Sequence, residues 1–237
     1  MSSIAEVVLT VVMPAYNEEA AIEQAVCEAQ RGVLDMVHDS EMIVVDDGSR
    51  DSTGAILDRL AAGDGRVRVI HQANGGHGRA LRAGLDEARG EYLFLIDSDR
   101  QIPLDAFQAL WRAGRGRDAA LGIRTKRQDP WLRLVLTRVI RTTLRVLGMP
   151  LRDANCPFKV LRRSVWQTAR KFMPPETLAP SLFLALFIQR RGLDYVEVEV
   201  PHRERTTGVV SIRRWKLLKF CTRSFFQLLV FYGRIGQ

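Results

Sequence analysis

Two aspartates separated by one residue, Asp97 and Asp99, are followed by the amide of Gln101. Carboxylate and amide oxygens are hard ligands of the kind that Mg²⁺ and Mn²⁺ prefer. We therefore expect these side chains to bind one such ion and, through it, a diphosphate. The aspartate pair is a short pattern, and by itself it more often marks only the polar turn at the end of a strand.

Strand-like and helix-like segments alternate through the first half of the chain. Apolar runs at 7–13, 41–45, 66–71 and 92–96 indicate buried strands, and Pro14 is expected to end the first of them. This alternation predicts an α/β fold with a mostly parallel sheet and crossover helices. In such sheets ligands bind off the carboxyl ends of the strands, which is where the last run delivers the aspartate pair.

Two more polar loops follow predicted strands. Asp46 and Asp47 end the second strand, where a carboxylate can accept hydrogen bonds from a base or ribose, although a simple turn with a helix cap explains them equally well. After the third strand comes a glycine-rich turn containing Asn74, Gly76 and Gly78, which permits close backbone approach to a ligand. It is neither a Walker loop nor a first-turn Rossmann fingerprint.

Composition limits the classes of partner. A chain of 237 residues suits one large domain or a domain with a small appendage, and its net charge of +8 indicates an anionic partner. That partner could be nucleic acid, a membrane surface or a phosphorylated substrate. The 3 cysteines match no zinc or redox pattern, and we recognise no signal peptide and no spanning segment, so we expect a cytoplasmic protein.

The second half predicts strands at 118–122, 160–161 and 195–200 and a buried helix within 176–191. It also contains amphipathic basic segments.

Those segments are 130–148 and 213–232. Apolar residues opposite arginines or lysines are typical of helices that lie on an anionic membrane. A core helix with a solvated basic face is the alternative for either segment alone, but the presence of two favours peripheral binding to the membrane.

Four ordered motifs resemble the nucleotide-sugar-binding half of the family 2 glycosyltransferases, which have the GT-A fold. They are VVMPAYNEE at 11–19, VVDDGSRDST at 44–53, NGGHGRALRAG at 74–84 and IDSDRQIP at 96–103. The resemblance implies a Rossmann-like, mostly parallel sheet flanked by helices, with amphipathic interface helices in the C-terminal half. We expect a catalytic domain over 1–212, including the helix at 130–148, and a membrane-interface helix over 213–237.

The resemblance also implies roles for individual residues. The metal-binding and catalytic positions would be Asp97, Asp99 and Gln101, with Mg²⁺ or Mn²⁺ as the cofactor. The nucleotide sugar would be bound by Pro14, Ala15, Tyr16, Asn17, Glu18, Asp46, Asp47, Asn74, Gly76, Gly78, Asp97, Ser98 and Asp99.

The extension of the aspartate motif to Gln101 and Pro103 looks like the polyprenyl-phosphate (dolichol-phosphate) sugar synthases. This likeness implies inverting transfer of a hexose to a polyprenyl phosphate at the cytosolic face of a membrane. GDP-mannose is the preferred donor and UDP-glucose is compatible. The chain departs from that pattern at Arg100, where Leu is frequent, and at Cys156-Pro157, where a small residue and glycine are usual.

A phosphate acceptor changes what the site requires. Its second pKa is about 6, so it is largely anionic at neutral pH and needs cationic positioning rather than a general base. By family position the candidates for binding it are Arg124, Arg138 and Arg205, because arginine can bind phosphate bidentately. Each of them taken alone is more often a surface charge.

Other functions stay open at this point. The same fold could glycosylate a soluble or glycan hydroxyl, which would require a general base. A basic nucleic-acid- or membrane-surface-binding module belongs to a different class. We expect no nucleic-acid partner, because the basic residues are interleaved with Leu, Val and Phe. A homo-oligomer is compatible with the sequence.

The membrane hypothesis can be tested on the first amphipathic segment. Replacing both Leu136 and Ile140 with Asp should release the protein from anionic liposomes, because the substitutions place charge on the inserted face. Sedimentation with liposomes at low salt measures this. Retention of the double mutant, or failure of the wild type to bind, would make a soluble acceptor the leading interpretation.

Overall fold

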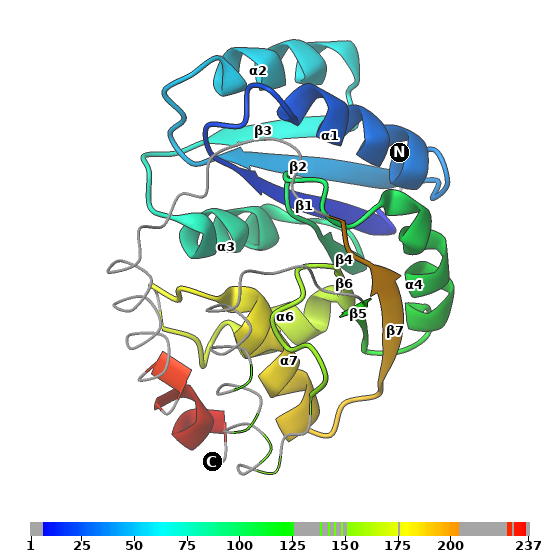
Figure 1. Ribbon diagram of the computed structural model, residues 1–237, viewed down its shortest axis with the longest axis vertical. Coiled ribbons are helices and arrows are strands. Elements are labelled where there is room, and N and C mark those ends of the chain that lie inside the picture. Colours follow the sequence, from blue (N-terminus) through cyan, green and yellow to red (C-terminus); the bar gives the residue numbers. More distant parts are fainter. Residues whose placement is uncertain are drawn as a thin grey trace, which may run out of the picture.

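The computed structural model describes residues 7–125, 151–174, 176–203, 227–228 and 230–235, together with positions 138, 142, 145 and 148. Within these residues, seven strands form one sheet in the order β3-β2-β1-β4-β6-β5-β7 (Figure 1). The strands are β1 (Leu9–Ala15), β2 (Ser40–Asp46), β3 (Val67–His71), β4 (Tyr92–Leu95), β5 (Ala119–Thr125), β6 (Lys159–Arg162) and β7 (Tyr195–Pro201).

The sheet is parallel except around β6. Strands β1 to β4 run parallel to one another, and β5 pairs in parallel with β7. Strand β6 is antiparallel to both β4 and β5, between which it lies. The mostly parallel α/β sheet predicted from the sequence is therefore confirmed.

Helices cover both faces of the sheet. They are α1 (Ile22–Ala29) with the π-helical turn η1 (Gln30–Leu34), α2 (Thr53–Gly63), α3 (His77–Glu87), the 3₁₀ turn η2 (Leu104–Ala106), α4 (Phe107–Gly114), α6 (Arg163–Ala169) and α7 (Pro180–Arg190). One apolar core joins the sheet to α3, α6 and α7, and a second joins its other face to α1, α2 and α4. Because both faces are covered, β1, β2 and β4 are buried at every residue rather than at alternate residues.

Pro14 does not end the first strand, contrary to the prediction. It lies within β1 and pairs in register with Val45 of β2. Pairing of β1 with β4 stops earlier, at Val12 opposite Leu95. Beyond Val12 the β4 side of β1 therefore lies outside the ladder, and there a missing backbone N–H breaks no strand pairing.

The described end of the C-terminal tail packs into the protein. Leu228, Phe231 and Ile235 are buried in the same core as α7, and the ring of Phe231 lies 4.7 Å from that of Phe183. Gln227 donates to the carbonyl of Glu176 at 2.9 Å. This part of the tail belongs to the core of the domain, which differs from the separate membrane-interface helix expected over 213–237.

The rest of that tail and most of the segment at 130–148 lie outside the described residues. Positions 138, 142 and 145 are helical and exposed, and the membrane-interface helix over 130–148 stays a prediction. Among the helices that the structure describes, none has the length and apolarity needed to cross a membrane.

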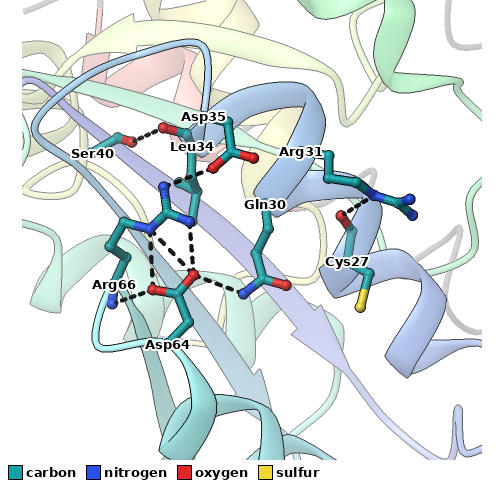
Figure 2. Close-up of polar contacts among 8 residues, drawn as sticks. All are labelled: Cys27, Gln30, Arg31, Leu34, Asp35, Ser40, Asp64 and Arg66. Carbon is teal, nitrogen blue, oxygen red and sulfur yellow. Dashed lines mark hydrogen bonds and ion pairs between the residues drawn. The ribbon is translucent and has the colours of Figure 1, made fainter.

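A polar cluster ties η1 to the turn before β3 (Figure 2). Arg66 pairs with Asp64 at 2.8 Å and with Asp35 at 2.9 Å, and Gln30 donates to Asp64 at 2.8 Å. The Arg66 guanidinium is the main reason that the pKa of Asp64 is lowered to about 2. The cluster lies at the amino end of the strands and therefore braces the edge opposite the polar loops.

Candidate active site

Asp97, Asp99 and Gln101 follow β4 at the carboxyl edge of the sheet and line one pocket. Arg124, the last residue but one of β5, lines the same pocket. The remaining lining residues are Ile96, Ile102, Pro157, Phe158 and His202. The structure thus brings the three predicted metal ligands together with one predicted acceptor residue.

The turn that carries the ligands is held by its own hydrogen bonds. The backbone N–H of Gln101 donates to Oδ1 of Asp99 at 3.1 Å, and the Gln101 carbonyl accepts from the N–H of Arg203 at 2.8 Å. Gln101 Nε2 also donates to the Arg203 carbonyl, at 3.4 Å. The turn is therefore joined to the segment that follows β7.

The donor set fits a divalent cation. With its Nε2 directed to Arg203, Gln101 leaves its carbonyl oxygen Oε1 as the atom that could bind a cation. Within the described ranges no group of three His, Cys, Asp or Glu side chains gathers into a metal cage. The candidate ligands are therefore two carboxylates and an amide. Mg²⁺ is commonly bound by one or two carboxylates together with substrate phosphates.

Asp47 shapes the glycine-rich turn. Its side chain accepts hydrogen bonds from the N–H groups of Gly75 at 2.8 Å and Gly76 at 2.7 Å, and from Nε2 of Gln72 at 2.7 Å. Asn74 donates to the Asp47 backbone carbonyl at 3.0 Å. Asp47 is only 2% exposed, and these internal hydrogen bonds are sufficient to account for an aspartate at this position. Its contact with a nucleoside stays a prediction.

Asp46 is buried at the end of β2 beside His71. One carboxylate oxygen accepts from the N–H of Ser49 at 2.9 Å, and the other lies 2.9 Å from Nδ1 of His71. The second ring nitrogen of His71 lies 2.9 Å from a carboxylate oxygen of Asp58. Ionised carboxylates only accept hydrogen bonds, so this geometry suits a doubly protonated imidazole.

The pKa values of the two partners agree with that geometry. The carboxylates of Asp58 and Asp46 raise the pKa of His71 above its usual value. Burial alone would raise the pKa of Asp46, but hydrogen bonds from Ser49 and His71 outweigh it, and the pKa is lowered.

The two predicted nucleoside loops form one unit. The N–H of Asn17 donates to Oγ of Ser49 at 3.0 Å, and the N–H of Arg50 donates back to Oδ1 of Asn17 at 2.8 Å. Asn17 has a φ of 52°, a left-handed conformation that asparagine tolerates. Tyr16 beside it is 39% exposed, so its ring is accessible for stacking.

The glycine-rich turn leads directly into α3. Gly76, with a φ of 85°, precedes His77, whose Nε2 lies 3.8 Å from Oδ1 of Asp97. A side chain on Gly78 would collide with the backbone carbonyl of Thr177. Helix packing therefore requires glycine at 78, whereas the sequence suggested close approach to a ligand.

The three arginines predicted to bind the acceptor phosphate differ in what the structure shows of them. Arg124 is 13% exposed and binds Asp153 through Nε at 2.7 Å and Nη2 at 2.9 Å. Arg138 is exposed at an isolated described position, and Arg205 lies outside the described residues. The phosphate-binding role of all three stays a prediction, and Asp153 fixes the orientation of the one arginine that lines the pocket.

A buried lysine supports the loop that supplies Asp153. The ammonium of Lys159 is fully buried and donates to Ser181 Oγ at 2.7 Å, to the Ala154 carbonyl at 3.2 Å and to the Cys156 carbonyl. Burial lowers the pKa of Lys159 to about 8. The sequence shows a basic residue here, but only the fold shows that it is an internal support.

Four residues near the site were not predicted to act in it: His77, Asp153, Lys159 and His202. His77, Asp153 and Lys159 lie inside segments that carry sequence motifs, but nothing in the local pattern distinguishes them from their neighbours. His202 reaches the pocket only because the segment after β7 returns to Gln101.

Residues 10–170 match the model of a known protein family, described as glycosyl transferase family 2. The matched part is more than half of the 237 residues. The chain belongs to glycosyl transferase family 2.

The chain is similar to larger proteins of this kind. The undecaprenyl-phosphate 4-deoxy-4-formamido-L-arabinose transferase of Pseudomonas aeruginosa is 31% identical over 214 residues, covering 89% of this chain and 62% of that protein. The transferase of the same name from Aeromonas hydrophila is 29% identical over 204 residues, covering 84% of this chain and 61% of that protein. The chain therefore spans less than two thirds of the length of these relatives.

A solved structure shares the fold. Glucosyl-3-phosphoglycerate synthase from Mycobacterium tuberculosis, in complex with Mn²⁺, uridine diphosphate and glucosyl-3-phosphoglycerate, superposes with a TM-score of 0.71 at 22% identity. The match covers 95% of this chain and 80% of that chain. It confirms the predicted GT-A fold.

The His71 contacts predict a pH-dependent contribution to stability. Because the pKa of His71 is raised on folding, its contribution is complete below the unfolded pKa of 6.5 and is lost as pH rises through the folded value. The urea midpoint of His71→Gln should fall below that of the wild type at pH 6, and the difference should shrink by about half or more by pH 9.

His38→Gln is the control, because His38 is another exposed histidine and lies away from the polar loops. It should show no such pH-dependent difference. If the urea midpoint of His71→Gln fell below that of the wild type by the same amount at both pH values, a doubly protonated His71 between Asp46 and Asp58 would be contradicted.

Proposed function

We propose that this protein transfers a sugar from a nucleotide diphosphate sugar to a polyprenyl phosphate, with Mg²⁺ or Mn²⁺ as cofactor and with inversion at the anomeric carbon. The observation that carries the proposal is the pocket shared by Asp97, Asp99, Gln101 and Arg124. Membership of glycosyl transferase family 2 supports sugar transfer. The names of the relatives from Pseudomonas and Aeromonas support a polyprenyl-phosphate acceptor.

The donor would lie along the carboxyl edge of β1, β2 and β4. Tyr16 and Asp46 would contact the nucleoside, with Asn17 and Ser49 holding their two loops together. Asp97, Asp99 and Gln101 would hold the metal ion beside the diphosphate. A bound divalent cation neutralises the charge that develops on a leaving diphosphate.

The acceptor would enter on the Arg124 side of the pocket. A phosphate oxygen attacks the anomeric carbon, the bond from that carbon to the diphosphate oxygen breaks, and the nucleoside diphosphate leaves with the electron pair. This acceptor needs no general base at neutral pH. Arg124, oriented by Asp153, would hold the attacking phosphate against the repulsion of the aspartates.

Several combinations of sugar and base are candidates for the donor. GDP-mannose is our preferred donor from the Asp-x-Asp-x-Gln run, and UDP-glucose is compatible with it. The relatives are named for 4-deoxy-4-formamido-L-arabinose, and a solved structure of the same fold contains Mn²⁺ and UDP-glucose. A donor panel therefore has to include all three sugars.

His202 favours a second candidate function. An imidazole in the pocket is a group that could accept the proton of a hydroxyl acceptor. The solved Mycobacterium synthase of the same fold was captured with UDP-glucose and glycerol 3-phosphate. Transfer to a small phosphorylated alcohol is thus the alternative, and it would use the same donor site.

We also propose that the protein acts as a peripheral protein on the cytosolic face of a membrane. The exposed positions Arg138 and Arg145 support this, since basic residues near an anionic surface contribute about 1 kcal/mol each. Membership of a sugar-transfer family argues against the nucleic-acid-binding module.

The function is tested by incubating the protein with Mn²⁺ or Mg²⁺, radiolabelled nucleotide sugars and both polyprenyl phosphate and glycerol 3-phosphate, then counting the label that each acceptor has received. We expect metal-dependent transfer from one donor. Label in glycerol 3-phosphate instead would favour the alternative, and no transfer to either acceptor would contradict the proposal.

Asp99→Asn should reduce transfer by on the order of a hundredfold or more, because it removes a charged metal ligand from the pocket. Asp105→Asn is the matched control, since Asp105 is an exposed carboxylate on the same segment and outside the pocket. Full activity of Asp99→Asn at saturating Mn²⁺ would remove Asp99 from the site.

A further inference from the structure

We propose that Arg100 is a positioning residue for the metal ion, through a latch that holds the 97–101 turn against α1. The inference rests on the proposed metal-dependent function. Arg100 lies between Asp99 and Gln101, two of the three candidate ligands. Its side chain points away from them and binds Gln24 and Glu28 of α1.

The latch uses the whole guanidinium group. Nη2 and Nε of Arg100 donate to the two carboxylate oxygens of Glu28 at 2.6 and 3.1 Å, and Nη1 donates to Oε1 of Gln24 at 2.7 Å. Bidentate arginine–carboxylate pairs fix orientation as well as distance. The two charged side chains are 25% and 32% exposed, so the pair is partly shielded from water.

The backbone of Arg100 shows why the turn needs such a hold. Its φ is 57°, in the left-handed region that side chains with a Cβ rarely adopt. This reversal sets Asp99 and Gln101 on either side of it and allows the Gln101 N–H to reach Oδ1 of Asp99. An unfavourable conformation of this kind persists only where the surrounding contacts enforce it.

Helix α1 is a rigid anchor for the latch. Ile22, Ala25, Val26 and Ala29 bury one face of the helix in the core. The other face presents Gln24 and Glu28 to Arg100. Helix α1 follows directly from the loop that contains Tyr16 and Asn17. The latch would therefore fix the position of the 97–101 turn relative to this predicted nucleoside-binding loop.

A second ion pair on α1 provides a control that distinguishes positioning of the metal ligands from general stabilisation of the fold. Arg59 of α2 pairs with Glu23 at 2.9 Å, but this pair is 64% and 57% exposed and does not touch the turn. Removing either arginine deletes one α1 ion pair. Only the loss of Arg100 should change metal binding.

The test measures the affinity of the full chain for Mn²⁺. Electron paramagnetic resonance detects the bound ion, in the presence and absence of uridine diphosphate. Arg100→Leu should weaken Mn²⁺ binding by on the order of tenfold, the usual effect of removing a group that orients a metal ligand. Glu28→Gln should change it in the same direction, and Arg100→Lys should lie between Arg100→Leu and the wild type. Arg59→Leu should bind Mn²⁺ like the wild type.

Wild-type affinity in both Arg100→Leu and Glu28→Gln would overturn the latch, as would equal weakening in Arg59→Leu. Should Arg100→Leu fail to fold, Glu28→Gln decides, because its side chain has the same shape. Absence of Mn²⁺ binding by the wild type would overturn the metal site and the latch together. Mn²⁺ binding that depends on Arg100 in a protein without transferase activity would leave the latch standing and overturn only the proposed reaction.

Discussion

Strand β1 lies between β2 and β4, and its parallel hydrogen bonding to both of them determines where the polar side chains gather. The register pairs Ala15 with Asp46 on one side and Val12 with Leu95 on the other. The chain therefore leaves all three strands at the same edge, and the loops that follow converge there. One residue of slip in either pairing would turn the aspartates toward the opposite face of the sheet.

Several polar groups at this edge serve the protein itself. Asp47 gathers the N–H groups of the glycine-rich turn, and Asp153 orients Arg124. Buried carboxylates with several hydrogen-bond donors are rigid, so they place neighbouring groups accurately. We infer that the candidate site is preorganised: its outer carboxylates hold loops in position, and Asp97 and Asp99 are directed to the pocket.

Local pattern and motif spacing predicted the first four strands, the carboxyl-edge location of the aspartates and the cluster of Asp97, Asp99 and Gln101. Longer-range features could not be predicted. The antiparallel insertion of β6 between β4 and β5 leaves no mark on a four-residue strand. The sequence of the C-terminal tail has the same apolar pattern whether Phe231 and its apolar neighbours contact a membrane or α7. The pairing of Arg124 with Asp153 depends on the tertiary fold.

Anomalous diffraction from crystals soaked with Mn²⁺ and either guanosine diphosphate or uridine diphosphate tests most directly whether this pocket holds the metal and the diphosphate. We predict that with at least one of the two nucleotides a single strong Mn²⁺ peak lies within coordination distance of Asp97, Asp99 and Gln101 and next to the diphosphate, with the base beside Tyr16 and Asp46. A metal peak at another place, or a nucleotide bound without contact to Asp97 and Asp99, would contradict it.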